Sequence, residues 1–224
     1  MKLSLIFPLS QEKDGATEKL RDIASFWARF PIEVEVLLVL DPSRGETLQD
    51  WQNLITAAGV QPRLQFRLEM NSKKLGRGAS VQKGLDLATG EILAVNSFDL
   101  SIPLGDVFSA LQEFIMHRDQ DFVVIGNRRG PKKKRRGLST SKRMLFENIE
   151  HDKAASLQVP DPTCPFLMLK KKTWLALQPL RLRRWFYSPG LVLAARHKQI
   201  EVRVVDVQCL DHPSTRLSLW DLFR

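Results

Sequence analysis

A basic loop punctuated by glycines, followed by an acidic residue after a short apolar run, is the part of this chain best suited to chemistry. The loop holds Gly76, Arg77 and Gly78 and opens a helical segment, after which the apolar run Ile92–Val95 leads to Asp99. In open α/β sheets ligands gather at the carboxyl ends of strands, and a glycine-rich basic turn before a helix suits phosphate. The pattern suggests a site for a phosphate or a sugar nucleotide.

The elements that must position these residues alternate between strand and helix. Aliphatic runs predict strands at Leu3–Phe7, Glu33–Leu40, Leu64–Leu68, Ile92–Val95, Asp121–Ile125, Phe166–Lys170 and Glu201–Cys209. Helical spacing predicts helices at Asp14–Phe30, Thr47–Ala58, Gly78–Ala88, Leu104–Met116, Ser139–Ser156, Lys172–Leu177 and Trp185–Lys198. This order predicts a single α/β domain with a mostly parallel sheet sandwiched by helices.

Length and composition narrow the class of protein. The 224 residues suit one domain, which we expect to span 1–212, with a short amphipathic tail at 213–224. No apolar run reaches the roughly 18–20 residues of a membrane span, and the first apolar stretch is too short for a signal peptide. Cys164 and Cys209 imply no disulfide framework, which favours a reducing cytoplasm. The formal net charge of +9 points to an anionic partner: nucleic acid, anionic lipid or a phosphorylated substrate.

Seven segments, taken in order, resemble the family 2 glycosyltransferases of the GT-A fold, which is Rossmann-like. The resemblance is strongest to the branch that transfers a sugar onto dolichyl or polyprenyl phosphate. The segments are LSLIFPLSQE at 3–12, VLLVLDPSRGET at 36–47, the loop at 71–84, the stretch 89–104, IGNRR at 125–129, DPTCPFLMLK at 161–170 and the helix at 185–196. They are similar to the family's proline turn, its "DDGS" loop, "GKGAAVRKG", "FMDADLSTPL", "GSRR", "DTQCGFKLFR" and "WAFDVELLYLAR".

The resemblance implies a role for each matching position. Nucleotide binding falls on Pro8, Glu12, Asp41, Asn71, Gly78 and Lys83. Catalytic roles fall on Asp99, Arg128 and Asp161. Independently of the resemblance, the positive charge of Arg129, Lys132, Arg135 and Arg136 makes these side chains candidates for binding the phosphates or the acceptor. Asp99 and His212 are the candidate ligands for a divalent ion, Mg²⁺ or Mn²⁺.

Several acids of the family pattern are replaced. Ser97 stands at the first place of the family's Asp-x-Asp metal motif, so that only Asp99 remains, and Leu40 stands at the first acid of the nucleotide loop. A single carboxylate beside a hydroxyl is a weak site for a hard cation. Arginines, beginning with Arg128, are suited to neutralise a diphosphate directly through their bidentate fork.

Two further acids are missing from the late helix, where the family's Asp and Glu fall on Ser188 and Gly190. A sugar-hydroxyl acceptor needs a base to remove its proton, and this chain lacks those candidates. A phosphate acceptor is mostly ionised at neutral pH, because its second pKa is about 6, and needs cations instead. The change therefore favours an anionic acceptor.

The basic insert at about 128–143, with the run RRGPKKKRR, is open to three interpretations. The three interpretations are a solvated loop, a binding site for phosphate or lipid headgroups, and a surface for nucleic acid or for nuclear localisation. No aromatic residues are interleaved with the charges, as a stacking surface would require, so we expect no nucleic-acid partner.

Two hypotheses of different classes follow. The first is a cytoplasmic enzyme, peripheral to the inner face of a membrane, that transfers a hexose with inversion from UDP- or GDP-sugar to polyprenyl phosphate or another anionic acceptor. The second is a catalytically silent GT-A domain that serves as a binding or scaffolding module. Dependence of nucleotide binding or donor hydrolysis on a divalent ion discriminates between them.

Overall fold

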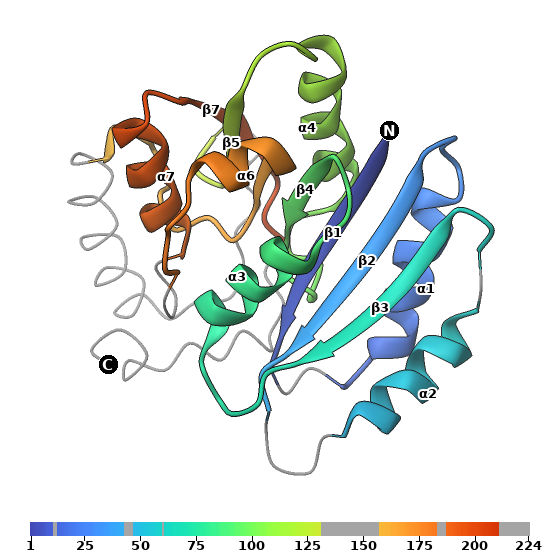
Figure 1. Cartoon of the computed structure of the whole chain (residues 1–224). Helices are drawn as coiled ribbons and strands as arrows, with labels where there is room; N and C mark the ends of the chain where they lie inside the picture. The colour runs from blue at the N-terminus through green and yellow to red at the C-terminus, as the bar shows by residue number, and fades with distance from the viewer. Residues whose placement is uncertain (11–12, 43–46, 60, 131–156, 183–186, 211–224) are drawn as a thin grey trace.

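The computed structural model describes residues 1–10, 13–42, 47–59, 61–130, 157–182 and 187–210, and these form one layered α/β unit (Figure 1). The described strands are β1 (Lys2–Leu9), β2 (Glu33–Leu40), β3 (Leu64–Met70), β4 (Ile92–Val95), β5 (Phe122–Asn127), β6 (Leu167–Lys170) and β7 (Glu201–Asp206). They form one sheet in the order β3-β2-β1-β4-β6-β5-β7. The single α/β domain expected for this part of the chain is confirmed.

Helices cover both faces of the sheet, so the core has two layers. One face packs against α1 (Ala16–Trp27), α2 (Leu48–Ala58) and α4 (Leu104–Met116). The other packs against α3 (Arg77–Leu87), α6 (Lys171–Ala176) and α7 (Tyr187–His197) (Figure 1).

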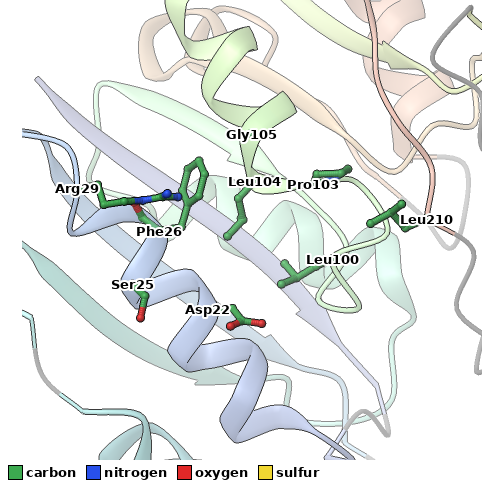
Figure 2. Close-up of a pocket in the computed structure, with 9 residues that line it drawn as sticks. All are labelled: Asp22, Ser25, Phe26, Arg29, Leu100, Pro103, Leu104, Gly105 and Leu210. Atoms are coloured by element: carbon green, nitrogen blue, oxygen red, sulfur yellow. The ribbon is translucent and has the colours of Figure 1, made fainter.

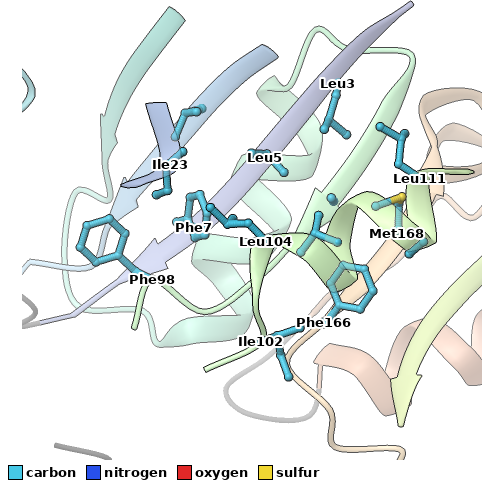
Figure 3. Close-up of a cluster of buried hydrophobic side chains, with 14 of the residues drawn as sticks. Leu3, Leu5, Phe7, Ile23, Phe98, Ile102, Leu104, Leu111, Phe166 and Met168 are labelled. Carbon is cyan, nitrogen blue, oxygen red and sulfur yellow. The ribbon is translucent and has the colours of Figure 1, made fainter. Parts of the chain in front are cut away.

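The alternation of side chains along β1 explains the two layers. Leu3, Leu5 and Phe7 point to the side of α1 and α4, where they meet Phe98 and Phe166, as Figure 3 shows. Ile6, one residue out of phase, belongs to the cluster on the other face. Successive strand side chains point to opposite faces, so a strand buried on both sides is mostly apolar, and Ser4 is the one polar residue between Leu3 and Leu9.

The direction of the strands brings distant segments to one edge. β1, β2, β3 and β4 are mutually parallel, whereas β6 runs antiparallel to β4 and β5. The segments that follow β1 to β5 therefore lie at the same edge as the segment that precedes β6. We call this the carboxyl edge; every predicted site residue with a described position lies there or on the adjoining α3.

Most predicted elements are confirmed, and the differences are local. β2, β4 and α4 have the predicted bounds, and β3 runs two residues further than expected. The prediction that the last strand reaches Cys209 is wrong: β7 ends at Asp206, and the chain then turns so that the Leu210 amide donates to the Ser101 carbonyl (2.8 Å). The predicted helix at 139–156 and the tail at 213–224 lie outside the described residues.

Candidate active site

Asp41, directly after β2, organises the loop that leads to α3. Its Oδ1 accepts from the Leu75 amide (2.8 Å) and from Asn71 Nδ2 (3.1 Å), and its Oδ2 accepts from the Gly76 amide (2.8 Å). Gly76 has a φ of 89°, a conformation that residues with a Cβ rarely adopt. Asp41 therefore fixes the glycine-punctuated loop, and its contact with a nucleoside stays a prediction.

Asn71, Gly78 and Lys83 share the neighbourhood of that loop. Asn71 is buried and also donates to the Ser80 hydroxyl (2.8 Å), while Gly78 is buried in the first turn of α3. Lys83 donates to the Met70 carbonyl (2.6 Å), so it braces the end of β3. Pro8 is buried near the end of β1. The structure therefore groups these four predicted nucleotide-binding residues around the ends of β1 to β3.

Arg77, the first residue of α3, reaches the segment after β4. Its Nη2 donates to the Ser97 hydroxyl (2.5 Å), and Ser97 is only 7% exposed. Burial raises the pKa of Tyr187, at the start of α7, and the nearby Arg77 and Arg128 guanidinium groups oppose that rise.

Asp99 lies in a tight turn between β4 and α4. Its Oδ1 accepts from the Ser101 amide (3.0 Å), and the next residue, Leu100, has a φ of 54°, which is rare for a residue with a side chain. The Asn96 side-chain amide donates to the Ile102 carbonyl (3.1 Å) and so stabilises the turn. The N-cap position of α4 is Pro103, so Asp99 does not cap that helix. Its half-buried carboxylate remains at the carboxyl edge.

Arg128 and Asp161 form a bidentate ion pair at this edge. Arg128 Nε and Nη2 donate to the two carboxylate oxygens at 2.7 Å each, and the Arg128 amide donates to Oδ2 (3.0 Å). Thr163 accepts from the same guanidinium (3.0 Å). Burial raises the pKa of Asp161, but the Arg128 guanidinium outweighs it and holds the pKa below its ordinary value. Both Asp161 oxygens are therefore engaged in orienting Arg128.

Arg129 lies in the turn after β5, which is supported from β7. The Arg129 amide donates to Asn127 Oδ1 (3.0 Å), and Asn127 Nδ2 donates to Asp206 (2.7 Å). Glu12, Lys132, Arg135, Arg136 and His212, the remaining predicted site residues, lie outside the described part of the chain.

The start of α7 packs against the segment before β6. Ser188 donates to the Cys164 carbonyl (2.8 Å), and Tyr187 donates to the Pro165 carbonyl (2.9 Å). The thiol of Cys164 is fully buried, which raises its pKa to about 12, so it serves packing and not nucleophilic chemistry. Ser188, where the resemblance places an acid, is thus a structural hydroxyl.

A separate groove of about 570 Å³ lies between α1 and the start of α4 (Figure 2). Phe26, Leu104 and Leu210 supply apolar surface, and Asp22 and Arg29 lie on its α1 side. None of the predicted site residues lines it. Leu100 and Pro103 of the segment after β4 also line the groove, so it adjoins the carboxyl edge without including a predicted site residue.

A family model, glycosyl transferase family 2, matches residues 4–174, which is more than half of the chain. The chain belongs to glycosyl transferase family 2. Within this family it is similar to the dolichyl-phosphate beta-glucosyltransferase of Trichomonas vaginalis, at 26% identity over 92% of this chain and 63% of that protein. It is also similar to the dodecaprenyl-phosphate galacturonate synthase of Rhizobium johnstonii, at 27% identity over 55% of this chain and 35% of that protein. This family 2 chain therefore spans less than two thirds of either relative's length.

Solved structures support the fold of this family 2 chain. The glucosyl-3-phosphoglycerate synthase of Mycobacterium tuberculosis in complex with Mn²⁺ and UDP-glucose has a TM-score of 0.69 at 13% identity, covering 99% of this chain and 74% of that one. Its complex with UDP gives 0.67 at 14% identity over the same shares. The GT-A architecture is confirmed. In the described part of the chain, no helix is long and apolar enough to cross a membrane.

The residues of this family 2 chain do not fit a divalent ion well. Among the described residues, no three His, Cys, Asp or Glu side chains are grouped to hold a metal. Ser97, at the first place of the family's metal motif, accepts from a guanidinium, which leaves Asp99 as the one described acid of that motif. Of the two predicted ligands, His212 is not described.

Two residues that contribute to the candidate site, Arg77 and Thr163, are not among those predicted from the sequence. Arg77 lies in the basic turn expected to suit phosphate, at the lysine of the family's "GKGAAVRKG", but is not itself one of the predicted site residues; its contact with Ser97 joins residues twenty positions apart. Thr163 lies between Asp161 and Cys164 in the sequence, and its hydroxyl accepts from the Arg128 guanidinium together with the Asp161 carboxylate. The joint change to an arginine in the loop and a serine in the metal motif was the available signal for Arg77.

Proposed function

We propose that this chain transfers a hexose from a nucleotide-sugar, UDP- or GDP-linked, to polyprenyl phosphate or another anionic acceptor, with inversion at the anomeric carbon. The observation that carries the proposal is Arg128, held at the carboxyl edge by the buried Asp161 through two bonds of 2.7 Å. A guanidinium oriented in advance stabilises developing phosphate charge without reorganising during the reaction.

The donor is bound across the ends of β1 to β4. Glu12 and Asp41 contact the nucleoside, with Pro8, Asn71, Gly78 and Lys83 shaping its pocket. Asp99, half-buried in the turn after β4, orients the donor sugar. This arrangement agrees with the general rule that ligands bind outside the carboxyl ends of strands in open α/β sheets.

The reaction is a displacement that requires no proton transfer. A phosphate oxygen of the acceptor dianion bonds to the anomeric carbon while the bond from that carbon to the diphosphate oxygen breaks. The bonding pair leaves with the diphosphate, whose added negative charge Arg128 and Arg129 stabilise, and Asp161 acts by positioning Arg128. The total charge is unchanged, because the acceptor loses one negative charge as the nucleoside diphosphate gains one.

The choice of a phosphate acceptor is supported by the start of α7. Ser188 is hydrogen-bonded to the Cys164 carbonyl and Gly190 has no side chain, so neither supplies a base for a sugar hydroxyl. The two curated relatives are named for transfer to dolichyl and dodecaprenyl phosphate. The net charge of +9 and the run Lys132–Arg136 favour an anionic membrane surface as the place where this acceptor is met, on the cytoplasmic side.

The test is a transfer assay with the purified chain, radiolabelled UDP-glucose or GDP-mannose, and a polyprenyl phosphate in detergent. We expect label to enter the lipid fraction, and Arg128→Lys to reduce the rate by about 10²-fold or more, because lysine lacks the bidentate fork. Lys172→Met is the matched control: it removes an exposed cation from α6, at the opposite edge of the sheet, and should leave the rate unchanged. Nucleotide binding without transfer to any acceptor would favour the silent module.

A further inference from the structure

A guanidinium occupies the place where the family pattern leads one to expect a metal-binding acid. Arg77 Nη2 lies 2.5 Å from Ser97 Oγ, and Ser97 stands at the first position of the Asp-x-Asp motif. The contact links the start of α3 to the turn after β4, two segments held in place by the Asp41 and Asn96 bonds described above. The fold therefore fixes the position of the Arg77 guanidinium beside Ser97.

This contact is unfavourable for a divalent ion at the same place. A cation bound between Ser97 and Asp99 would share the serine oxygen with a fixed positive charge, and like charges at such a separation repel each other. Asp99 offers one carboxylate, of which Oδ1 already accepts from the Ser101 amide. Hard divalent ions need several oxygen ligands, usually more than one of them anionic.

We propose that in this chain the Arg77 guanidinium replaces the divalent ion and binds the diphosphate of the nucleotide directly, so that nucleotide binding needs no metal. The inference rests on the proposed function and adds to it the means by which the leaving group is held. Guanidinium forms short, charge-assisted and bidentate hydrogen bonds to phosphate oxygens, and so provides the positive charge that a divalent ion would otherwise provide.

The surroundings of Arg77 agree with this role. Arg77 lies at the amino end of α3, where no acidic residue occupies the first turn, so the helix end adds positive partial charge on the same side. Arg77, at the start of α3, and Arg128, directly after β5, both lie at the carboxyl edge, and both oppose the rise that burial causes in the pKa of Tyr187. A diphosphate bound there meets a cation from each half of the sheet.

The experiment is calorimetric titration of the purified chain with UDP and GDP, each in Mn²⁺ and in EDTA, with uridine and guanosine as ligands that lack the diphosphate. We expect one nucleoside diphosphate to bind with the same affinity, within about twofold, in both buffers. Arg77→Met should weaken that binding by about 10- to 100-fold and leave binding of the nucleoside unchanged, because only the charge-assisted bonds to phosphate are lost. Arg63→Met, which removes an exposed arginine before β3 at the other edge, is the matched control and should bind as the wild type does.

A second variant separates loss of the arginine from loss of the fold. Arg77→Met combined with Ser97→Asp restores the acid pair of the family motif, and we expect its binding to regain strength in Mn²⁺ but not in EDTA. Binding by the wild type only in Mn²⁺ overturns the inference and leaves the proposed function standing. Binding of neither nucleotide in either buffer overturns the proposed function, and the inference with it.

Discussion

Removing Arg128 should destabilise the protein strongly, because its partner carboxylate cannot reach water. The Asp161 side chain is 0% exposed and the Arg128 side chain 18% exposed, with Nε and Nη2 each 2.7 Å from a carboxylate oxygen. Breaking a buried ion pair by removing one partner costs about 3–5 kcal/mol, since the remaining charge stays buried and uncompensated. At roughly 2–4 °C per kcal/mol for a domain of this size, Arg128→Met should lower Tm by about 6–20 °C.

A double-mutant cycle isolates the pair from its surroundings. The variants are Arg128→Met, Asp161→Asn and the two combined, and asparagine is chosen because its oxygen still accepts from the Arg128 backbone amide. The free energy of unfolding is measured for each by urea titration at pH 7. We expect the double variant to be more stable than the sum of the single losses predicts, by about 1–3 kcal/mol, because it buries no unpaired charge.

An exposed ion pair provides the comparison. Lys172 Nζ lies 2.9 Å from Asp121 Oδ1, but the two side chains are 60% and 44% exposed. Lys172→Met should therefore change the free energy of unfolding by less than about 1 kcal/mol. The reasoning is refuted if Arg128→Met costs no more than Lys172→Met, or if the single losses simply add in the double variant.

Three further predictions test the packing and the pH response. Gly84→Ala should lower the free energy of unfolding by about 1–3 kcal/mol, because its Cβ would lie 2.3 Å from Ile6 Cγ2. Gly190→Ala, whose Cβ would have no atom nearer than 3.8 Å, should instead stabilise α7 by about 0.5–1 kcal/mol. Thermal denaturation of the two variants compares these effects. Thr47→Ala removes the capping box of α2 and should cost about 0.5–2 kcal/mol in urea unfolding, and no change would contradict the cap. The pKa of Asp161 lies below its ordinary 3.8, so the stability it contributes is present above that value and is lost as the pH falls through the folded-state pKa. Asp161→Asn should reduce the loss of unfolding free energy that occurs as the pH is lowered from 5. An unchanged pH dependence would show that other carboxylates cause this loss.

Local patterns in the sequence were sufficient for the elements of the fold. Glu33–Leu40 and Ile92–Val95 are mostly aliphatic, with Glu33 and Glu35 as exceptions, as expected of strands covered on both faces, and both strands have the predicted bounds. The spacing of Leu104, Val107 and Leu111 likewise predicted α4. The antiparallel direction of β6 and its place between β4 and β5 carry no local pattern, because hydrogen-bond partners in a sheet come from distant segments.

The candidate site, like the fold, was only partly predictable from the sequence. Motif order marked Asp41, Asp99, Arg128 and Asp161, since each follows or precedes a strand at the carboxyl edge. The contacts of each side chain could not be predicted from the sequence. Asp41 accepts hydrogen bonds from residues 34 and 35 positions away, and Arg128 donates to a residue 33 positions away. Such contacts depend on how the chain returns to the edge, not on neighbouring residues.

The sequence by itself determined the family, the alternation of strands and helices, and the edge of the sheet at which chemistry is expected. It also showed that acids are missing from the family's pattern at Ser97, Ser188 and Gly190. Only the tertiary structure decided what stands beside those positions: a guanidinium on Ser97 and a backbone carbonyl on Ser188. The physical reason is that propensity and periodicity act over a few residues, whereas an electrostatic site is made by side chains that only folding brings within hydrogen-bonding distance.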